Sequence, residues 1–259
     1  MIHFLRITLF FYFLGVVSSL AVLLLHRRSW SAVTPILVLV GFLLHLVAIV
    51  GIGLETGEFP IQDLNQTLSF LCWTTVLIYL LSYYRYRIES LNLIIPFLVV
   101  LLMSVSNLLP EGTLGLHERL LNPLDRFHIV VAIVGVSMLF LTFATSLLYL
   151  VLDQGLKAKR PLPFLMRLPS LEMCERVGYR SLIAGFSLLT IGLVTGAVAH
   201  AGTMDGSFPW RREGLAILSW GILALILIAR LARGWRGRRA AILTIIAFTG
   251  ILVRMLRIF

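Results

Sequence analysis

Histidine is the residue type in this chain whose chemistry and placement point most directly to a function. Three of the six histidines, His45, His128 and His200, lie inside or at the ends of apolar segments. Polar side chains are unfavourable inside a bilayer, so those retained there are candidates for function. Imidazole binds metal ions and is a standard axial ligand of haem iron. Because the three residues come from three different segments, they could share one site, in which a pair of histidines from facing helices would hold haem.

Each histidine alone also has a simpler interpretation. A histidine at the end of a span often lies at the polar interface, and one inside the membrane can bond to a backbone carbonyl group. His3, His26 and His117 fit that interpretation. The sequence has no Ser/His/Asp arrangement at a readable spacing, no glycine-rich phosphate loop and no HExxH motif. No catalytic residue is therefore predicted.

A connection at 201–213 is the second candidate for ligand binding. It contains Gly202, Gly206, Phe208, Pro209, Trp210, Arg211 and Arg212. Its aromatic side chains are suited to stacking on a flat ligand, and its arginines to pairing with carboxylates such as haem propionates. The alternative is an interfacial aromatic belt whose arginines face phospholipid headgroups. Composition alone favours the belt.

Apolar helices are the elements that must position these residues. Hydrophobic residues make up 59% of the chain and charged residues 13%, and the mean hydropathy is +0.97. A soluble domain is nearer half apolar and a quarter charged. Apolar blocks of about 20 residues predict an all-α, polytopic helical membrane bundle. Its eight spans are expected at about 4–26, 33–53, 64–84, 91–109, 127–152, 181–200, 214–231 and 240–256, in a single transmembrane domain of residues 1–259.

Basic residues predict the orientation of these spans. Most of the 22 Lys and Arg residues fall in the first, third, fifth and seventh connections. Since positive charge favours the cytoplasmic side, both termini are expected to face outside, in a bacterial inner membrane. The net charge of +10 is thereby explained without nucleic acid.

Three smaller expectations concern the chain's ends and connections. The apolar segment from Phe4 to Leu25 has no small-residue cleavage site and is expected to be a retained first span. The longest connection, 153–180, is basic and contains three prolines. Cys72 lies in an apolar block and Cys174 in that connection, so no disulfide is expected between them.

Several segments resemble the cytochrome c assembly superfamily of haem-handling membrane proteins, which includes CcsA/ResC, CcmC and CcmF. FPIQDLNQTLSFLCW at 59–73 is similar to the family's second loop and third span, with Asp63 and Gln66 in place of its usual Asn and Glu. TIGLVTGAVAHAG at 190–202 resembles the helix before a tryptophan-rich loop. SWGILALILIARLARGWRGRRAA at 219–241 resembles the segment after it. The likeness is closest to the short eight-span HemX-like and YpjD-like members.

The family's histidines are matched only in part. LNPLDRFHIVVAIVGVSMLFLTFATSLLYL at 121–150 resembles a small loop, a histidine and a long helix, which implies that His128 is an outer haem ligand. His45 matches the first in-membrane histidine of the longer members. Ile228 stands where the next helix of the family has its in-membrane histidine, and the second outer histidine would come after Phe259. We expect His200 to substitute as a ligand, which is not a family feature.

The tryptophan-rich loop is also reduced. PWRREGLAILSW at 209–220 keeps Trp210 and Trp220, whereas Arg211 stands where the family's motif has an aspartate. The resemblance therefore implies a reduced haem site on the outer side, to which the two tryptophans contribute. Covalent haem ligation is not expected of such a site.

The function that the resemblance implies is a membrane haem-binding or haem-handling accessory protein of cytochrome c assembly. Its cofactor would be haem, and its partners would be membrane lipid and other assembly or tetrapyrrole-synthesis proteins that dock on 153–180. One alternative is a non-enzymatic regulator or scaffold that controls tetrapyrrole synthesis, as implied by the HemX-like members. Another is an accessory to divalent-cation efflux, as implied by the YpjD-like members, although the spans lack the paired carboxylates expected of a cation path.

Overall fold

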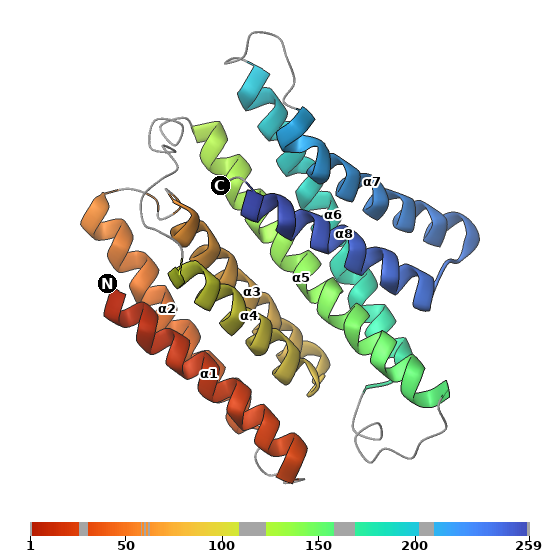
Figure 1. Ribbon diagram of the computed structural model, residues 1–259, viewed down its shortest axis with the longest axis horizontal. Coiled ribbons are helices and arrows are strands. Elements are labelled where there is room, and N and C mark those ends of the chain that lie inside the picture. Colours follow the sequence, from red (N-terminus) through yellow and green to blue (C-terminus); the bar gives the residue numbers. More distant parts are fainter. Residues whose placement is uncertain are drawn as a thin grey trace. The chain divides into compact units, whose positions relative to one another are not determined.

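The structure, a computed structural model, describes residues 2–25, 31–57, 59, 61, 63–108, 123–157, 169–201 and 210–257. At 2–3, 200–201, 210–213 and 256–257 it describes the backbone alone. These residues form helices and no strand. The helices are α1 (Ile2–Leu25), α2 (Val33–Thr56), α3 (Leu64–Tyr86), α4 (Leu91–Leu108), α5 (Pro123–Lys157), α6 (Leu171–Ala201), α7 (Trp210–Arg233) and α8 (Arg238–Arg257) (Figure 1).

The helices α1 to α7 are long and apolar enough to cross a membrane. The helix α8 carries Arg238, Arg239 and Arg254 and is not among these seven. The protein is therefore an all-helical, polytopic membrane protein, as the composition predicts. An eighth span and the orientation of the termini stay predictions.

Helix packing divides the chain into two compact units. In the first unit α1 packs against α2 and α4, and α3 packs against the same two helices. In the second unit α5 packs against α6 and α8, and α7 packs against the same two helices. Each unit is therefore a bundle of four helices. That the two form one transmembrane domain stays a prediction.

Side-chain hydrogen bonds join the helices of the first unit. The Ser19 hydroxyl of α1 donates to the backbone oxygen of Asn92 in α4 at 2.8 Å, and the Tyr79 hydroxyl of α3 donates to Oδ1 of the same residue at 2.9 Å. All three side chains are buried. A bilayer core supplies no water to replace such bonds, so one asparagine binds α1 and α3 to α4.

A row of glycines joins α5 to α6 in the second unit. We call Gly178, Gly185, Gly192 and Gly196 of α6 the glycine seam. A Cβ atom at Gly185 would lie 2.8 Å from Leu139 Cγ and 3.0 Å from the backbone oxygen of Gly135, both in α5. Real side chains do not approach so closely, so the two backbones can meet at this distance only because these positions are glycine.

The order of the seam's contacts gives the direction of the two helices. From Gly178 to Gly196 the residue of α5 that lies closest is in turn Thr145, Leu139, Ala132 and His128. The numbers fall along α5 as they rise along α6, so the helices are antiparallel and lie side by side (Figure 1).

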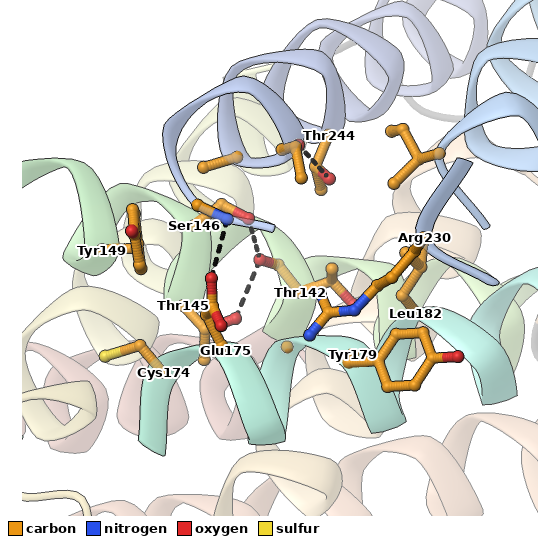
Figure 2. Close-up of a pocket in the computed structure, with 15 residues that line it drawn as sticks. Thr142, Thr145, Ser146, Tyr149, Cys174, Glu175, Tyr179, Leu182, Arg230 and Thr244 are labelled. Carbon is orange, nitrogen blue, oxygen red and sulfur yellow. Dashed lines mark hydrogen bonds between the residues drawn. The ribbon is translucent and has the colours of Figure 1, made fainter. Parts of the chain in front are cut away.

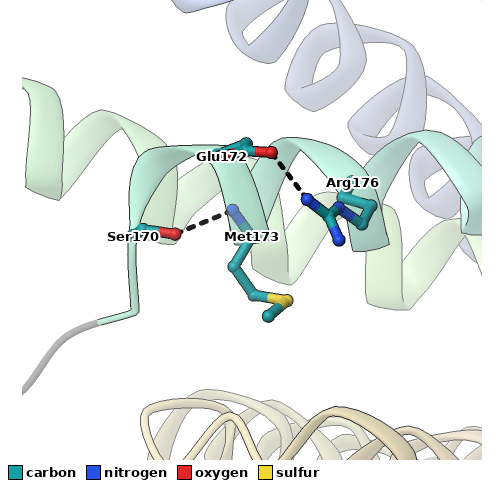
Figure 3. Close-up of polar contacts among 4 residues, drawn as sticks. All are labelled: Ser170, Glu172, Met173 and Arg176. Carbon is teal, nitrogen blue, oxygen red and sulfur yellow. Dashed lines mark hydrogen bonds and ion pairs between the residues drawn. The ribbon is translucent and has the colours of Figure 1, made fainter.

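The predicted connection at 153–180 is wrong at both ends, because α5 continues to Lys157 and α6 begins at Leu171. Figure 3 shows the cause at α6: the Ser170 hydroxyl accepts a bond from the Met173 N–H at 3.1 Å, and Arg176 pairs with Glu172 at 2.6 Å. A cap at the first turn, and an ion pair between residues four apart, stabilise a helix even where the sequence is polar. Cys174 is accordingly a buried helical residue and not part of a loop.

Other helix ends differ from the predicted spans by a few residues. The largest of these differences are at the starts of α5 and α7, which begin four residues early, at Pro123 and Trp210. The helix α5 begins with proline, whose fixed φ suits the first turn. The two cysteines are unpaired, as predicted.

Substitution of Gly185 by valine should separate α5 from α6. Overpacking of this kind costs about 1–3 kcal/mol of unfolding free energy. The measurement is the thermal unfolding midpoint of purified protein in detergent. The matched control is Gly221→Val in α7, where nothing lies within 4 Å of a Cβ atom. Equal shifts in the two variants would contradict the role of the seam.

Candidate functional site

His128 is held in place by the glycine seam. It lies in the second turn of α5, and its Nδ1 is 2.6 Å from the backbone oxygen of Gly192 in α6. A carbonyl oxygen only accepts, so Nδ1 carries a proton. In the neutral ring the lone pair is then on Nε2, which is the nitrogen suited to a metal ion. Histidines that bind metals usually donate their other N–H to a carbonyl or carboxylate in this way.

Gly196 shapes the space that the imidazole ring occupies. A Cβ atom there would lie 2.6 Å from Cε1 of His128 and 2.9 Å from Nδ1. Any larger residue would therefore displace the ring. Nδ1 and Nε2 flank Cε1 in an imidazole, so Nε2 is directed away from the carbonyl group of Gly192.

His200 stands one turn beyond Gly196 on α6. Gly192, Gly196 and His200 are spaced by four residues, so the register places them along one helix face. The predicted place of His200 at the end of this helix is confirmed, whereas its side chain lies outside the described part. The prediction that Trp210 lies in a loop is wrong, because it is the first residue of α7. Its side chain also lies outside the described residues.

Trp220 is used in packing α7 against α6. Its indole Nε1 donates to the Thr190 hydroxyl at 2.9 Å. Its ring stacks on Phe186, with the ring centroids 5.5 Å apart and the planes at 21°. The donor and one face of the indole are thereby occupied, and a role in binding haem stays a prediction.

His45 belongs to the first unit, whereas His128, His200 and Trp220 belong to the second. It is 0% exposed. Its Nδ1 lies 3.2 Å from the Tyr12 hydroxyl of α1, and its Nε2 lies 2.8 Å from the Ser69 hydroxyl of α3. Since both ring nitrogens have side-chain partners, His45 joins three helices. Iron could replace one of these bonds only after the network had opened.

Sequence reasoning missed the residues that hold the histidines. Gly192 and Gly196 were detectable in principle, since small residues four apart are a known signal of close helix packing. Tyr12 and Ser69 carried no such signal. Asp63 and Gln66, which depart from the family pattern, form the N-terminal cap of α3, in which Asp63 Oδ1 accepts from the Gln66 N–H at 2.7 Å.

In the part of the chain that the structure describes, no group of three His, Cys, Asp or Glu side chains gathers as a metal site would require. Among the described side chains of the second unit, the one imidazole is that of His128, which bonds to the backbone of α6. Haem needs no such group of side chains, because one or two histidines suffice.

Replacement of His45 by alanine should destabilise the first unit, because the Tyr12 and Ser69 hydroxyls would lose their partner. Each buried hydroxyl left unpaired costs about 1–3 kcal/mol. A double-mutant cycle with Ser69→Ala, followed by thermal unfolding in detergent, measures the coupling between the two residues. Strict additivity of the two substitutions would contradict the bond.

Comparison with known proteins supports the family resemblance that the sequence indicates. Residues 61–258 match the family described as Cytochrome C assembly protein. The chain is 28% identical to the cytochrome c biogenesis protein CcsA of Prochlorococcus marinus subsp. pastoris, over 95% of this chain and 86% of that protein. CcsA of Chlamydomonas reinhardtii is 29% identical, over 75% and 56% of the two chains. CcsA of Guillardia theta is 27% identical, over 75% and 71%.

The likeness to HemX-like and YpjD-like members stays a prediction. The family match extends from the segment before α3 to α8 and therefore includes helices of both units. This chain belongs to the cytochrome c assembly protein family.

Proposed function

We propose that this protein binds and handles haem during cytochrome c assembly, as an accessory protein of a bacterial inner membrane. The family and the relatives named for cytochrome c biogenesis support a role in cytochrome c assembly. The resemblance of 121–150 to a haem-ligand element supports haem as the molecule that is handled. Haem would be substrate here, delivered or held and not chemically changed.

The bond from His128 Nδ1 to the Gly192 carbonyl group is the observation that carries this proposal. It fixes the ring's orientation and leaves the lone pair of the neutral ring on Nε2. Because a backbone carbonyl group cannot rotate away as a side chain can, the ring is held before iron arrives. Such pre-organisation raises affinity by reducing the ordering needed on binding.

His200 is the proposed second ligand. Its support is the register of α6, which places it one turn from Gly196 on the face that His128 contacts. We assign Trp220 the role of positioning α7 beside this face, through its contacts with Thr190 and Phe186. Trp210 would provide an aromatic wall at the start of α7. A role of His45 in binding haem stays a prediction.

The remaining functions have less support. A regulator that docks on 153–180 would depend largely on residues 158–168, which lie outside the described residues. A cation-efflux accessory would need clustered metal ligands, and none gather among the described residues.

Replacement of His128 by glycine should reduce the haem that survives detergent washing by about ten-fold or more, as loss of a ligand's anchoring does. The measurement is the Soret absorbance of purified protein after addition of haem. Imidazole in solution should restore the absorbance, since it can occupy the space of the lost ring. If imidazole restores the Soret absorbance, the variant has lost a ligand of haem and has kept its fold.

Gly196→Ala should weaken haem binding by displacing the His128 ring, and Gly221→Ala is its matched control because a methyl group there contacts nothing. His200→Ala tests the second ligand through a change in the position of the Soret band. Haem retention that is the same in wild type, His128→Gly and Gly196→Ala would refute the proposed site.

A further inference from the structure

A polar cavity lies in the second unit, near the ends of α5 and α7 and the starts of α6 and α8. Its volume is about 40 Å³, and it is partly open to the outside. One water needs about 10–15 Å³ by the same measure, so the cavity admits about three water-sized groups. Figure 2 shows its polar lining, which comes from all four helices. The seam's Gly178 lies in its wall beside Thr145.

Arg230 extends from α7 into this cavity (Figure 2). Its guanidinium carbon lies 4.1 Å from the centroid of the Tyr179 ring, which holds it by a cation–π contact. In the described part of the chain none of its guanidinium N–H groups donates a hydrogen bond. A half-buried guanidinium that is fixed in place and has no acceptor is suited to a phosphate group.

Glu175 supplies the opposite charge. It lies on α6, and its Oε1 accepts a bond from the Gly237 N–H at 2.7 Å, just before α8 begins. No ion pair joins Glu175 to Arg230 among the described residues. The cavity therefore contains one anion and one cation that attract each other through space, without a direct ion pair in the described part of the chain.

Hydroxyl groups of α5 and α8 complete the polar lining of the cavity. Thr145, Ser146 and Thr244 each donate their proton to a carbonyl oxygen of their own helix, at 2.8 to 3.0 Å. Their oxygens therefore face the cavity only as acceptors. Acceptors beside a carboxylate favour a ligand group that is positively charged and carries several N–H donors, such as a primary ammonium group.

We infer that this cavity binds the headgroup of phosphatidylethanolamine from the surrounding membrane. The phosphate pairs with Arg230, and the ammonium group enters the cavity toward Glu175 and the hydroxyls. The position favours a lipid over a soluble zwitterion, because Arg233, Arg236, Arg238 and Arg239 lie at the end of α7 and the start of α8, around Gly237 of the cavity wall. Such basic groups are typical of the headgroup layer of the cytoplasmic leaflet.

The size and chemistry of the cavity distinguish this headgroup from others. An ammonioethyl group has three non-hydrogen atoms, which matches the space. The trimethylammonium of phosphatidylcholine is larger and has no N–H to donate. Phosphatidylglycerol has no positive group for Glu175, and phosphatidylserine would bring a second carboxylate beside it.

The test is lipid retention by the full chain. The protein is reconstituted in vesicles of equal parts phosphatidylethanolamine, phosphatidylcholine and phosphatidylglycerol and extracted in mild detergent. Retained lipid is then counted by native mass spectrometry. Wild type should retain phosphatidylethanolamine over phosphatidylcholine by about ten-fold, the value of one hydrogen bond to a charged group. Glu175→Gln should abolish this preference, although its amide oxygen can still accept from Gly237.

Two matched controls accompany these variants. Glu172→Gln removes an equal charge one turn away, at an exposed residue whose partner is Arg176 (Figure 3). Arg230→Gln should lower retention of both lipids, and exposed Arg233→Gln should not. Thr145→Val, which keeps the side chain's shape, should reduce the preference for phosphatidylethanolamine. This variant replaces Glu175→Gln in the test if Glu175→Gln does not fold.

The outcomes separate a bound lipid headgroup from a soluble ligand and from a general effect of charge. A preference that persists in both Glu175→Gln and Thr145→Val, or that Glu172→Gln removes equally, overturns the inference. Soluble phosphoethanolamine that displaces the lipid at equal concentration would assign the cavity to a soluble ligand and would also overturn it. Haem retention is not involved in any arm, so this test and that of the His128 site can fail separately.

Discussion

The close approach of α5 and α6 along the glycine seam is the constraint on which both sites of the second unit depend. Helices in lipid gain little from the hydrophobic effect when they associate, so packing and polar contacts must hold them together. Where side chains are absent, the backbone itself becomes a surface that side chains of the other helix can reach. At one end of the seam His128 bonds to that backbone at Gly192. At the other end the absence of a side chain at Gly178 leaves room for Thr145, which lines the cavity.

Polar groups of the spans are satisfied mainly within the helix that carries them or by one neighbour. Thr145 and Ser146 donate to carbonyl oxygens of α5 itself, which removes their donors from lipid without fixing a partner helix. His45 cannot do this, since its ring needs partners on other helices, and it therefore ties α2 to α1 and α3. A histidine in a span is thus first a packing element. His128 differs because its Nδ1 bonds to a backbone oxygen, that of Gly192, and not to a side chain.

Sequence patterns predicted the helical membrane class and the approximate place of each described helix, because apolar length is determined by bilayer thickness. They predicted His128 at the start of a long helix, through a local motif. They failed at 153–157 and 171–180, where caps and ion pairs such as Glu172–Arg176 maintain helix in polar sequence. They also could not find the partners of His45. Which residues of α1 and α3 face it depends on helix rotation, and the spans are too uniformly apolar to show a face.

The lengths of α5 and α6 determine how deep His128 lies in the membrane. The two helices have 35 and 31 residues, or about 52 and 46 Å, against about 30 Å for the hydrocarbon core. From Gly178 to Gly196 the seam is about 27 Å long, close to the thickness of that core. Where the seam spans that core, the cavity beside Gly178 and the His128 ring beside Gly196 lie at its two edges. A ligand bound there would be at the level of the lipid headgroups, accessible from water, and would not have to enter the hydrocarbon.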